Sequence, residues 1–136
     1  MTSAARLEGD IGDPDWKKRR VLELLDGALV PGDRERLQEL VSPEVKIVFP
    51  GFEARGHAGV DELLAMIDTL FDGCPTKSYD LWICEADAVN VHGVLYGRMK
   101  DGRSMDGTRY TDTFRFGPDG RVTHWLVFND LALLPA

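Results

Sequence analysis

The spacing of apolar residues changes midway along the chain, and this change constrains the fold more than any other feature. Up to about residue 75, apolar side chains recur mostly at helical spacing, interrupted by one expected strand over residues 45–49. From residue 77 onward they alternate with polar ones, which predicts strands over 77–85, 88–99, 104–116 and 121–128. Helices followed by consecutive strands are typical of an α+β domain. We therefore expect a strongly curved, mostly antiparallel sheet wrapped around three N-terminal helices.

Local signals set the expected boundaries of these elements. Asp13 followed by Pro14 is typical of a helix start, and Asp33 is expected to cap a second helix that runs to residue 40. A loop over residues 50–59 should precede the third helix. A chain of 136 residues holds one domain of ordinary size, which we place at 13–136 after a flexible tail over 1–12.

The composition excludes several classes of function. With 16 Lys and Arg against 23 Asp and Glu, the net charge is -7, which disfavours binding to nucleic acid or to an anionic membrane surface. Cys74 and Cys84 have no His at a metal-ligand spacing, so we expect neither a structural metal nor a disulfide framework. No stretch has the length of a transmembrane helix or the pattern of a signal peptide, which predicts a cytoplasmic protein.

The strand expected over 104–116 carries one acid on its apolar face. Side chains alternate between the two faces of a strand, and the face that includes Arg109 and Arg115 is polar. The opposite face consists of Tyr110, Asp112, Phe114 and Phe116. Burying a carboxylate costs several kcal/mol unless it is paired or protonated, so the pKa of Asp112 should be raised. Asp112 is then either a hydrogen-bonded structural acid or a group tuned for proton transfer.

The neighbouring strands offer partners for Asp112. In the last strand, alternation places His124 with Val122, Leu126 and Phe128, and a hairpin would continue the face of Asp112. His124 is therefore expected to reach Asp112, either as an acid–base partner or as a satisfied core histidine. Tyr96 and Tyr110 are interpreted as packing residues with a spare hydroxyl, and Arg98 as a surface residue or a cation for a polar substrate group.

Several short motifs between residues 15 and 134 carry a family resemblance. They are Gly56 with the helix after it, Leu95-Tyr96-Gly97-Arg98, Asp112-Thr113-Phe114-Arg115-Phe116, Asp119-Gly120-Arg121-Val122, His124-Trp125 and Phe128-Asn129-Asp130-Leu131. In these the chain resembles the nuclear transport factor 2-like (NTF2-like) superfamily, and within it the SnoaL-like group of small polyketide cyclases. The resemblance implies a cone-shaped α+β barrel with a deep apolar pocket, and homodimers formed through the outer face of the sheet.

The resemblance also implies roles for individual positions. In ketosteroid isomerases of this fold the position of Asp112 holds a protonated Asp that donates to the substrate oxyanion, whereas SnoaL-like cyclases have a His there. The isomerase's general base corresponds to Phe49 here, and the cyclase's catalytic Asp corresponds to Leu126. Limonene-type epoxide hydrolases need an Arg-x-Asp over residues 91–99, which this chain lacks.

These observations predict a cofactor-free acid–base enzyme that isomerises, cyclises or dehydrates a hydrophobic, carbonyl-bearing small molecule. Asp112 would stabilise an enolate or act as the acid, and His124 would act as the base or orient Asp112. The expected substrate-binding side chains are Tyr110, Arg98, Tyr96, Phe49, Phe114, Leu126, Phe128 and Trp16. The alternative is a non-catalytic small-molecule-binding or interaction module of the same fold, which apolar Phe49 and Leu126 would suit. Limonene-type epoxide opening is a weaker alternative.

Overall fold

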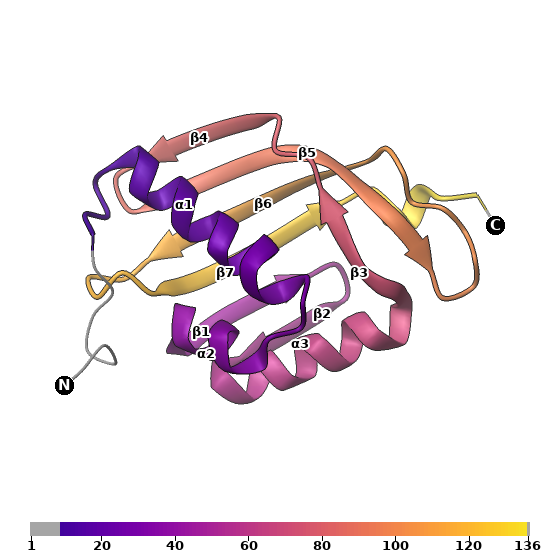
Figure 1. The fold of residues 1–136 in the computed structure, drawn as a ribbon, viewed down its shortest axis with the longest axis horizontal. Coiled ribbons are helices and arrows are strands. Elements are labelled where there is room, and N and C mark those ends of the chain that lie inside the picture. The colour runs from indigo at the N-terminus through magenta and orange to yellow at the C-terminus, as the bar shows by residue number, and fades with distance from the viewer. Residues whose placement is uncertain (1–8, 136) are drawn as a thin grey trace.

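Helices precede most of the strands in the computed structural model, which describes residues 9–135 (Figure 1). The helical elements are α1 (Pro14–Leu24), the π-helical turn η1 (Leu25–Leu29) that continues it, α2 (Arg34–Leu40), α3 (Gly56–Leu70) and the 3-10 turn η2 (Leu131–Leu133). The strands are β1 (Val41–Phe49), β2 (Phe52–Arg55), β3 (Phe71–Lys77), β4 (Leu81–Glu85), β5 (Ala88–Met99), β6 (Thr108–Phe116) and β7 (Val122–Asn129). The order confirms the expected α+β class.

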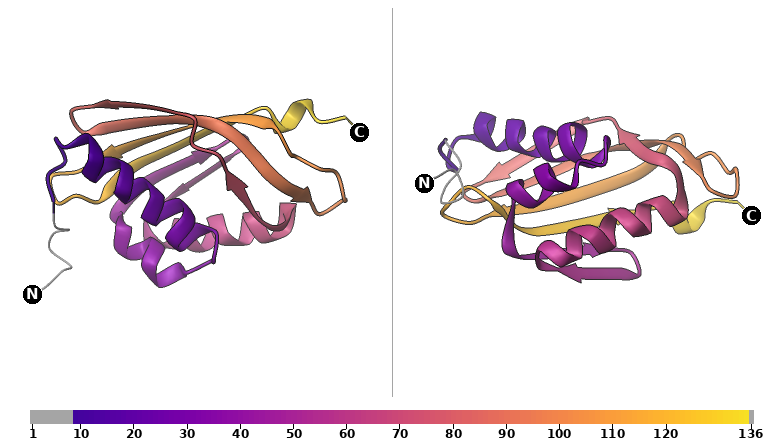
Figure 2. Two further views of the ribbon diagram at one scale, coloured as in Figure 1. Left: turned by 45° about the horizontal axis from the view of Figure 1, so that its top comes forward. Right: turned by 60° about the horizontal axis from the view of Figure 1, so that its bottom comes forward.

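All the strands belong to one curved sheet. Their order across it is β2-β1-β7-β6-β5-β3, and β4 also pairs with β5. Every pairing is antiparallel except that of β1 with β7, which is parallel. Figure 2 shows the sheet curling over the helices, which lie against its concave side. The expected cone-shaped fold is thus confirmed, with its interior between the sheet and the helices.

The predicted helix caps at Asp13 and Asp33 are confirmed, whereas other boundaries differ: α3 begins at Gly56 rather than after residue 59, and β6 begins at Thr108 rather than at residue 104. The side chain of Asp13 accepts from the N–H of Asp15 at 3.0 Å, and that of Asp33 accepts from Arg36 at 3.1 Å. Residues 50–59 do not form one loop, because Gly51 (φ +74°) turns the chain back to pair β2 with β1. The strand expected over 77–85 is also divided, since β3 and β4 pair with different parts of β5.

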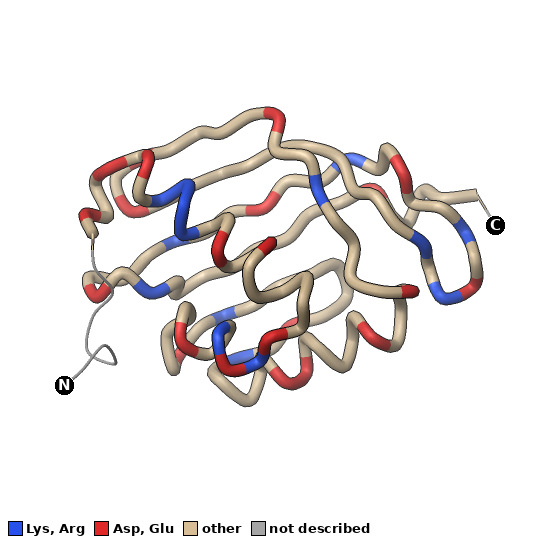
Figure 3. The backbone as a smooth tube through the Cα atoms, viewed as in Figure 1, with Lys and Arg blue, Asp and Glu red and all other residues tan. Residues whose placement is uncertain are grey.

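The interior of the cone is apolar and well packed. Phe114 of β6 and Trp125 of β7 are fully buried, with ring centroids 5.9 Å apart, and Leu24 and Leu63 of the helices belong to the same buried core. Each such side chain contributes roughly 1.5–3 kcal/mol when it leaves water. Charged positions along the backbone lie mostly towards the periphery, where blue and red segments are interspersed (Figure 3). Burial of apolar side chains therefore stabilises the fold, and a charged side chain inside this core needs an explanation.

A β-bulge between β6 and β7 decides which residues of β7 face that interior. Arg115 lies opposite His124, yet Phe116 lies opposite Val122, so β7 holds one extra residue at this point. An extra residue reverses the alternation of faces beyond it. Trp125 therefore turns inward, whereas His124 turns to the outer face of the sheet.

Candidate functional site

A small apolar cavity lies inside the open end of the cone. Its volume is about 40 Å³, and its walls include Phe49, Phe71, Leu95, Tyr110 and Val127, with Lys77 as the charged residue among them. It adjoins a depression of about 270 Å³ at the surface, and Phe49, Phe71, Asn129 and Leu131 line both. We refer to these hollows as the inner cavity and the mouth.

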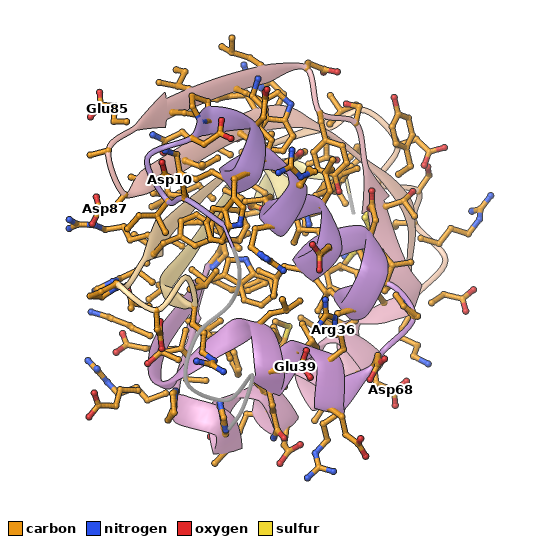
Figure 4. The ribbon with its side chains drawn as sticks, turned by 60° about the vertical axis from the view of Figure 1, so that its left-hand side comes forward. Asp10, Arg36, Glu39, Asp68, Glu85 and Asp87 are labelled. Carbon is orange, nitrogen blue, oxygen red and sulfur yellow. The ribbon has the colours of Figure 1, made fainter. Side chains whose placement is uncertain are left out.

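Lys77 and Asp112 form a buried ion pair beside the inner cavity. The Lys77 Nζ lies 3.6 Å from the Asp112 Oδ2, with side chains 10% and 0% exposed. Within residues 9–135, neither carboxylate oxygen of Asp112 has a hydrogen-bond partner. Burial raises the pKa of Asp112, and the nearby Lys77 ammonium opposes part of that rise. Carboxylates such as Asp10, Asp68 and Glu85 lie instead at the surface (Figure 4).

The antiparallel pairing of β3 with β5 positions Lys77. Lys77 pairs with Leu95 on β5, and the adjacent Ser78 is held at both ends of its backbone unit: its N–H donates to Val94 and its carbonyl accepts from the Tyr110 hydroxyl at 2.7 Å. A Cβ on Gly93 would lie 2.0 Å from the Ser78 carbonyl oxygen, so only glycine permits this close approach. The ammonium is thereby fixed against the inner face of β6.

Two of the predicted binding residues line the inner cavity. Tyr110 is 3% exposed, and the Lys77 Nζ lies 5.3 Å from its ring centroid, a cation–π distance. Burial raises the pKa of Tyr110, so its phenol stays protonated. Phe49 packs edge-on against Trp125 at 6.1 Å between ring centroids. Asp112 is also on the inner face, as the alternation of β6 predicts.

Lys77 and Asn129 line the inner cavity but are not predicted from the sequence. The sequence puts Lys77 at the start of an expected strand and does not say which face of that strand is buried. Its pairing with the buried Leu95 shows that the Lys77 side chain points to the inner face of the sheet. Alternation along β7 predicts an outward-facing Asn129, but the bulge reverses the alternation and turns its side chain inward. Its Oδ1 accepts from the Leu131 N–H at 3.2 Å, which orients the amide at the junction of cavity and mouth.

The predicted pairing of His124 with Asp112 is wrong. The bulge places His124 opposite Arg115 on the outer face, while Asp112 faces inward opposite Val127. The Nδ1 of His124 lies 3.0 Å from the hydroxyl of its neighbour Thr123 instead. His124 therefore supplies neither a base nor an orienting group to Asp112.

The other predicted binding residues do not line the inner cavity. Leu126 and Phe128 follow His124 to the outer face, and Phe128 is 57% exposed. Tyr96 and Arg98 are exposed on β5, where Arg98 donates to the Gly102 carbonyl. Phe114 lies deeper, under Trp125, and so belongs to the core.

Trp16 is at the opposite end of the cone from the cavity. Its ring meets Phe116 edge-on at 5.4 Å. Phe116 is six residues beyond Tyr110 on β6, a separation of about 20 Å along a strand. The prediction that Trp16 contacts a substrate beside Tyr110 is therefore wrong.

A larger hollow, of about 550 Å³, lies against the outer face of the sheet. Its polar groups already have partners: the Arg109 Nε donates to Asp130 at 2.7 Å, and the His92 Nδ1 lies 3.1 Å from the Thr111 hydroxyl. These groups are at least partly exposed to water, where ion pairs contribute little. We therefore place the candidate site at the smaller inner cavity, which holds a charge pair in apolar surroundings.

Phe71 separates three hollows. It lines the inner cavity, the mouth and a further depression of about 210 Å³, and it is 7% exposed. We expect Phe71→Leu to widen the inner cavity, at a cost in unfolding free energy of at most about 1.5 kcal/mol, because the change keeps most of the volume. Binding of an apolar fluorescent dye, followed by titration, should tighten. Unchanged dye affinity in a folded variant would show that Phe71 does not limit the cavity.

Among residues 9–135, no helix is both long and apolar enough to cross a membrane. Over the same residues, no three His, Cys, Asp or Glu side chains gather as a group that could hold a metal ion.

The fold and the sequence together define the class of protein. A family model described as a SnoaL-like domain matches residues 21–125. The chain therefore belongs to the SnoaL-like family. No curated protein matches it in sequence.

Solved structures with low sequence identity share this fold. A putative SnoaL-like polyketide cyclase from Jannaschia sp. CCS1 superposes with a TM-score of 0.77 at 21% identity, covering 94% of this chain and 93% of that one. An NTF2-like protein of unknown function from Burkholderia pseudomallei gives 0.76 at 19%, covering 87% and 93%. TerC, crystallised with polyporic acid, gives 0.73 at 21%, covering 87% and 94%. At these identities the likeness concerns the fold alone.

Proposed function

We propose that this protein is an acid–base enzyme that acts on a hydrophobic, carbonyl-bearing small molecule in the inner cavity. The observation that carries the proposal is the Lys77–Asp112 pair, because a stable core gains little from two buried charges. Replacing such a pair by apolar residues is often neutral or stabilising, so its presence beside a cavity points to chemistry. The SnoaL-like family and the putative polyketide cyclase among the similar structures support the same direction.

The pair suits a reaction in which negative charge develops on oxygen. A carbonyl oxygen in the inner cavity would accept a hydrogen bond from the Lys77 ammonium, which would stabilise the enolate formed when the Asp112 carboxylate takes an α-hydrogen as a proton. Asp112 would hold the ammonium in place and exchange a proton with it. Apolar walls such as Leu95 and Val127 strengthen these interactions by excluding water. Asn129 supplies a second polar group at the entrance.

A non-catalytic ligand-binding module is the second candidate, and the apolar residues at the positions of the family's catalytic groups favour it. The inner cavity is far smaller than the roughly 300–1,000 Å³ of pockets for drug-sized ligands, so either candidate would take only a small compound there. The positions at which relatives of this fold keep a general base hold apolar residues here: Phe49 lines the cavity, and Leu126 faces the outside. In this case Lys77 and Asp112 would fix the orientation of a bound carbonyl compound without turnover.

Hydrogen–deuterium exchange distinguishes the two candidates without knowledge of the true substrate. We expect the wild-type protein in D₂O to accelerate α-hydrogen exchange in some members of a panel of cyclic ketones and β-diketones, followed by proton NMR. His124→Ala is the matched control, since its side chain is on the outer face, and it should exchange at the wild-type rate. Saturable binding of these ketones without accelerated exchange would favour the binding module.

We further propose that the outer face of the sheet is covered by a second copy of the chain. Leu81, Ile83, Tyr96 and Phe128 are each more than 40% exposed on strands β4, β5 and β7 of this face. Exposed apolar side chains gathered on one face are typical of a contact surface. We expect sedimentation equilibrium to give twice the mass of one chain, and Phe128→Glu to lower it to one. A wild-type monomer at micromolar concentration would contradict the proposal.

A further inference from the structure

Lys77 is placed to do more than donate a proton. We propose that its amine captures a small aldehyde or ketone covalently, as an imine, in the inner cavity. The inference deepens the proposed function, and rests on it only in requiring that a carbonyl compound enters this cavity. It names amine catalysis, or reversible imine binding, as the chemistry of the site.

The surroundings of the Lys77 Nζ are those of a reactive amine. The side chain is 10% exposed and lines the cavity together with Leu95, Tyr110 and Val127. Three titratable groups lie near it: Asp112 at 3.6 Å, the Tyr110 ring at 5.3 Å, and the Cys74 thiol of the same strand. Lysines in apolar pockets are the ones that form Schiff bases, because water does not compete for the amine or hydrolyse the product freely.

Asp112 supplies the proton transfers that imine formation needs. An ammonium is not nucleophilic, but transfer of one proton from the Lys77 Nζ to the Asp112 carboxylate gives a neutral amine and a carboxylic acid. The net charge of the pair does not change in this step. Burial raises the pKa of Asp112, so the cost of placing a proton on its carboxylate is smaller here than in water.

The bond changes then balance without an oxidant or a reductant. The amine nitrogen attacks the carbonyl carbon, a C–N bond forms, and the carbonyl oxygen takes the proton from Asp112. The carbinolamine loses this oxygen as water when the C–O bond breaks, with the second proton coming from the nitrogen. The product is a protonated imine whose positive charge lies beside the Asp112 carboxylate, in the place of the original ammonium.

Lys17 and Lys100 lack this combination. Lys17 is more deeply buried than Lys77, but its Nζ donates to the carbonyl oxygens of Ile11 at 2.6 Å and Ala86 at 2.8 Å. Its role is to tie the start of α1 to the β4–β5 turn. Lys100 is exposed on the connection after β5. These two serve as internal controls, one buried and bound to backbone, the other free in water.

Reductive trapping tests the inference on the intact protein. The wild-type chain is incubated with propanal and sodium cyanoborohydride, which reduces an imine to a stable propylamine, and the labelled lysines are located by peptide mass spectrometry. We expect Lys77 to be labelled at least about tenfold faster than Lys100, as befits an amine activated by a neighbouring base. Lys17 should remain unlabelled. Labelling of Lys77 no faster than that of Lys100 would overturn the inference, and this comparison needs no variant.

Two variants separate this inference from the proposed function. Lys77→Arg keeps the positive charge but cannot form an imine, and Asp112→Asn keeps the shape but cannot take the proton. Selective labelling that slows at least about tenfold in Asp112→Asn supports the inference. Ketone α-hydrogen exchange that persists in a folded Lys77→Arg, with no selective label in the wild type, would overturn the imine and leave the acid–base proposal standing. Selective labelling of Lys77 without any ketone α-hydrogen exchange would support the imine and contradict the acid–base proposal.

Discussion

Replacing Lys77 by methionine lowers the free energy of unfolding at pH 7 by about 3–5 kcal/mol, the cost of leaving a buried charge without its partner. Asp112 is fully buried, and Lys77 opposes the rise in its pKa that burial causes. Without Lys77 that pKa rises further. Urea denaturation monitored by circular dichroism measures the difference.

The sign of the pH dependence follows from the same shift. A carboxyl whose pKa is raised on folding favours the folded state when it is protonated, so the stability it confers is lost as the pH rises through the folded-state pKa. The deficit of Lys77→Met should therefore shrink as the pH falls towards the ordinary range of an aspartate. The double variant Lys77→Met/Asp112→Leu should regain most of the loss at pH 7. Equal stability of Lys77→Met and wild type from pH 7 down to the ordinary pKa range of an aspartate would show that the two charges are not coupled.

The second large effect concerns catalysis. We expect Asp112→Asn to slow ketone α-hydrogen exchange by about 10²–10⁴, the usual contribution of a positioned acid–base group. Asparagine keeps the size of the side chain but can neither accept the proton of Lys77 nor balance its charge. The pH–rate profile should also lose the limb that reports the pair, a change that a purely structural role would not produce.

His124→Ala is the matched comparison for this experiment as well. Its side chain is on the same two-stranded ladder as Asp112 but on the opposite face of the sheet, so its rate and pH profile should match the wild type. A folded Asp112→Asn that exchanges at the wild-type rate would remove Asp112 from the mechanism. A large loss in His124→Ala would mean that the reaction takes place on the outer face.

The hydrophobic pattern was sufficient to predict the fold class and two residues of the site, Tyr110 and Asp112. Period-2 alternation along β6 places Asp112 among inward-facing aromatic residues, and the structure confirms its burial. The helix caps at Asp13 and Asp33 were likewise readable, because capping depends on a few adjacent residues. Local signals of this kind do not require knowledge of distant contacts.

The remainder of the site depends on features that alternation does not encode. One extra residue in the β6–β7 bulge turns His124 outward and Asn129 inward, which reverses the predicted faces of β7 from residue 124 onward, while Val122 faces inward as predicted. The side of Lys77 was set by its pairing with Leu95, a contact between separate strands. The size of the inner cavity depends on how side chains such as Phe71 pack, which a sequence pattern does not encode. The family resemblance implied a deep pocket, whereas the cavity in the structure is small.

One NMR titration tests most directly whether carbonyl compounds bind beside the Lys77–Asp112 pair. In protein labelled with ¹³C at the aspartate carboxyl groups, a cyclic ketone is added and all carboxyl resonances are followed together. We expect the Asp112 resonance to shift saturably. The resonances of Asp80 and Asp130, which line the 550 Å³ hollow on the outer face, and that of the exposed Asp68 should stay unchanged. Saturable shifts at Asp80 or Asp130 with an unmoved Asp112 would contradict the placement of the site in the inner cavity.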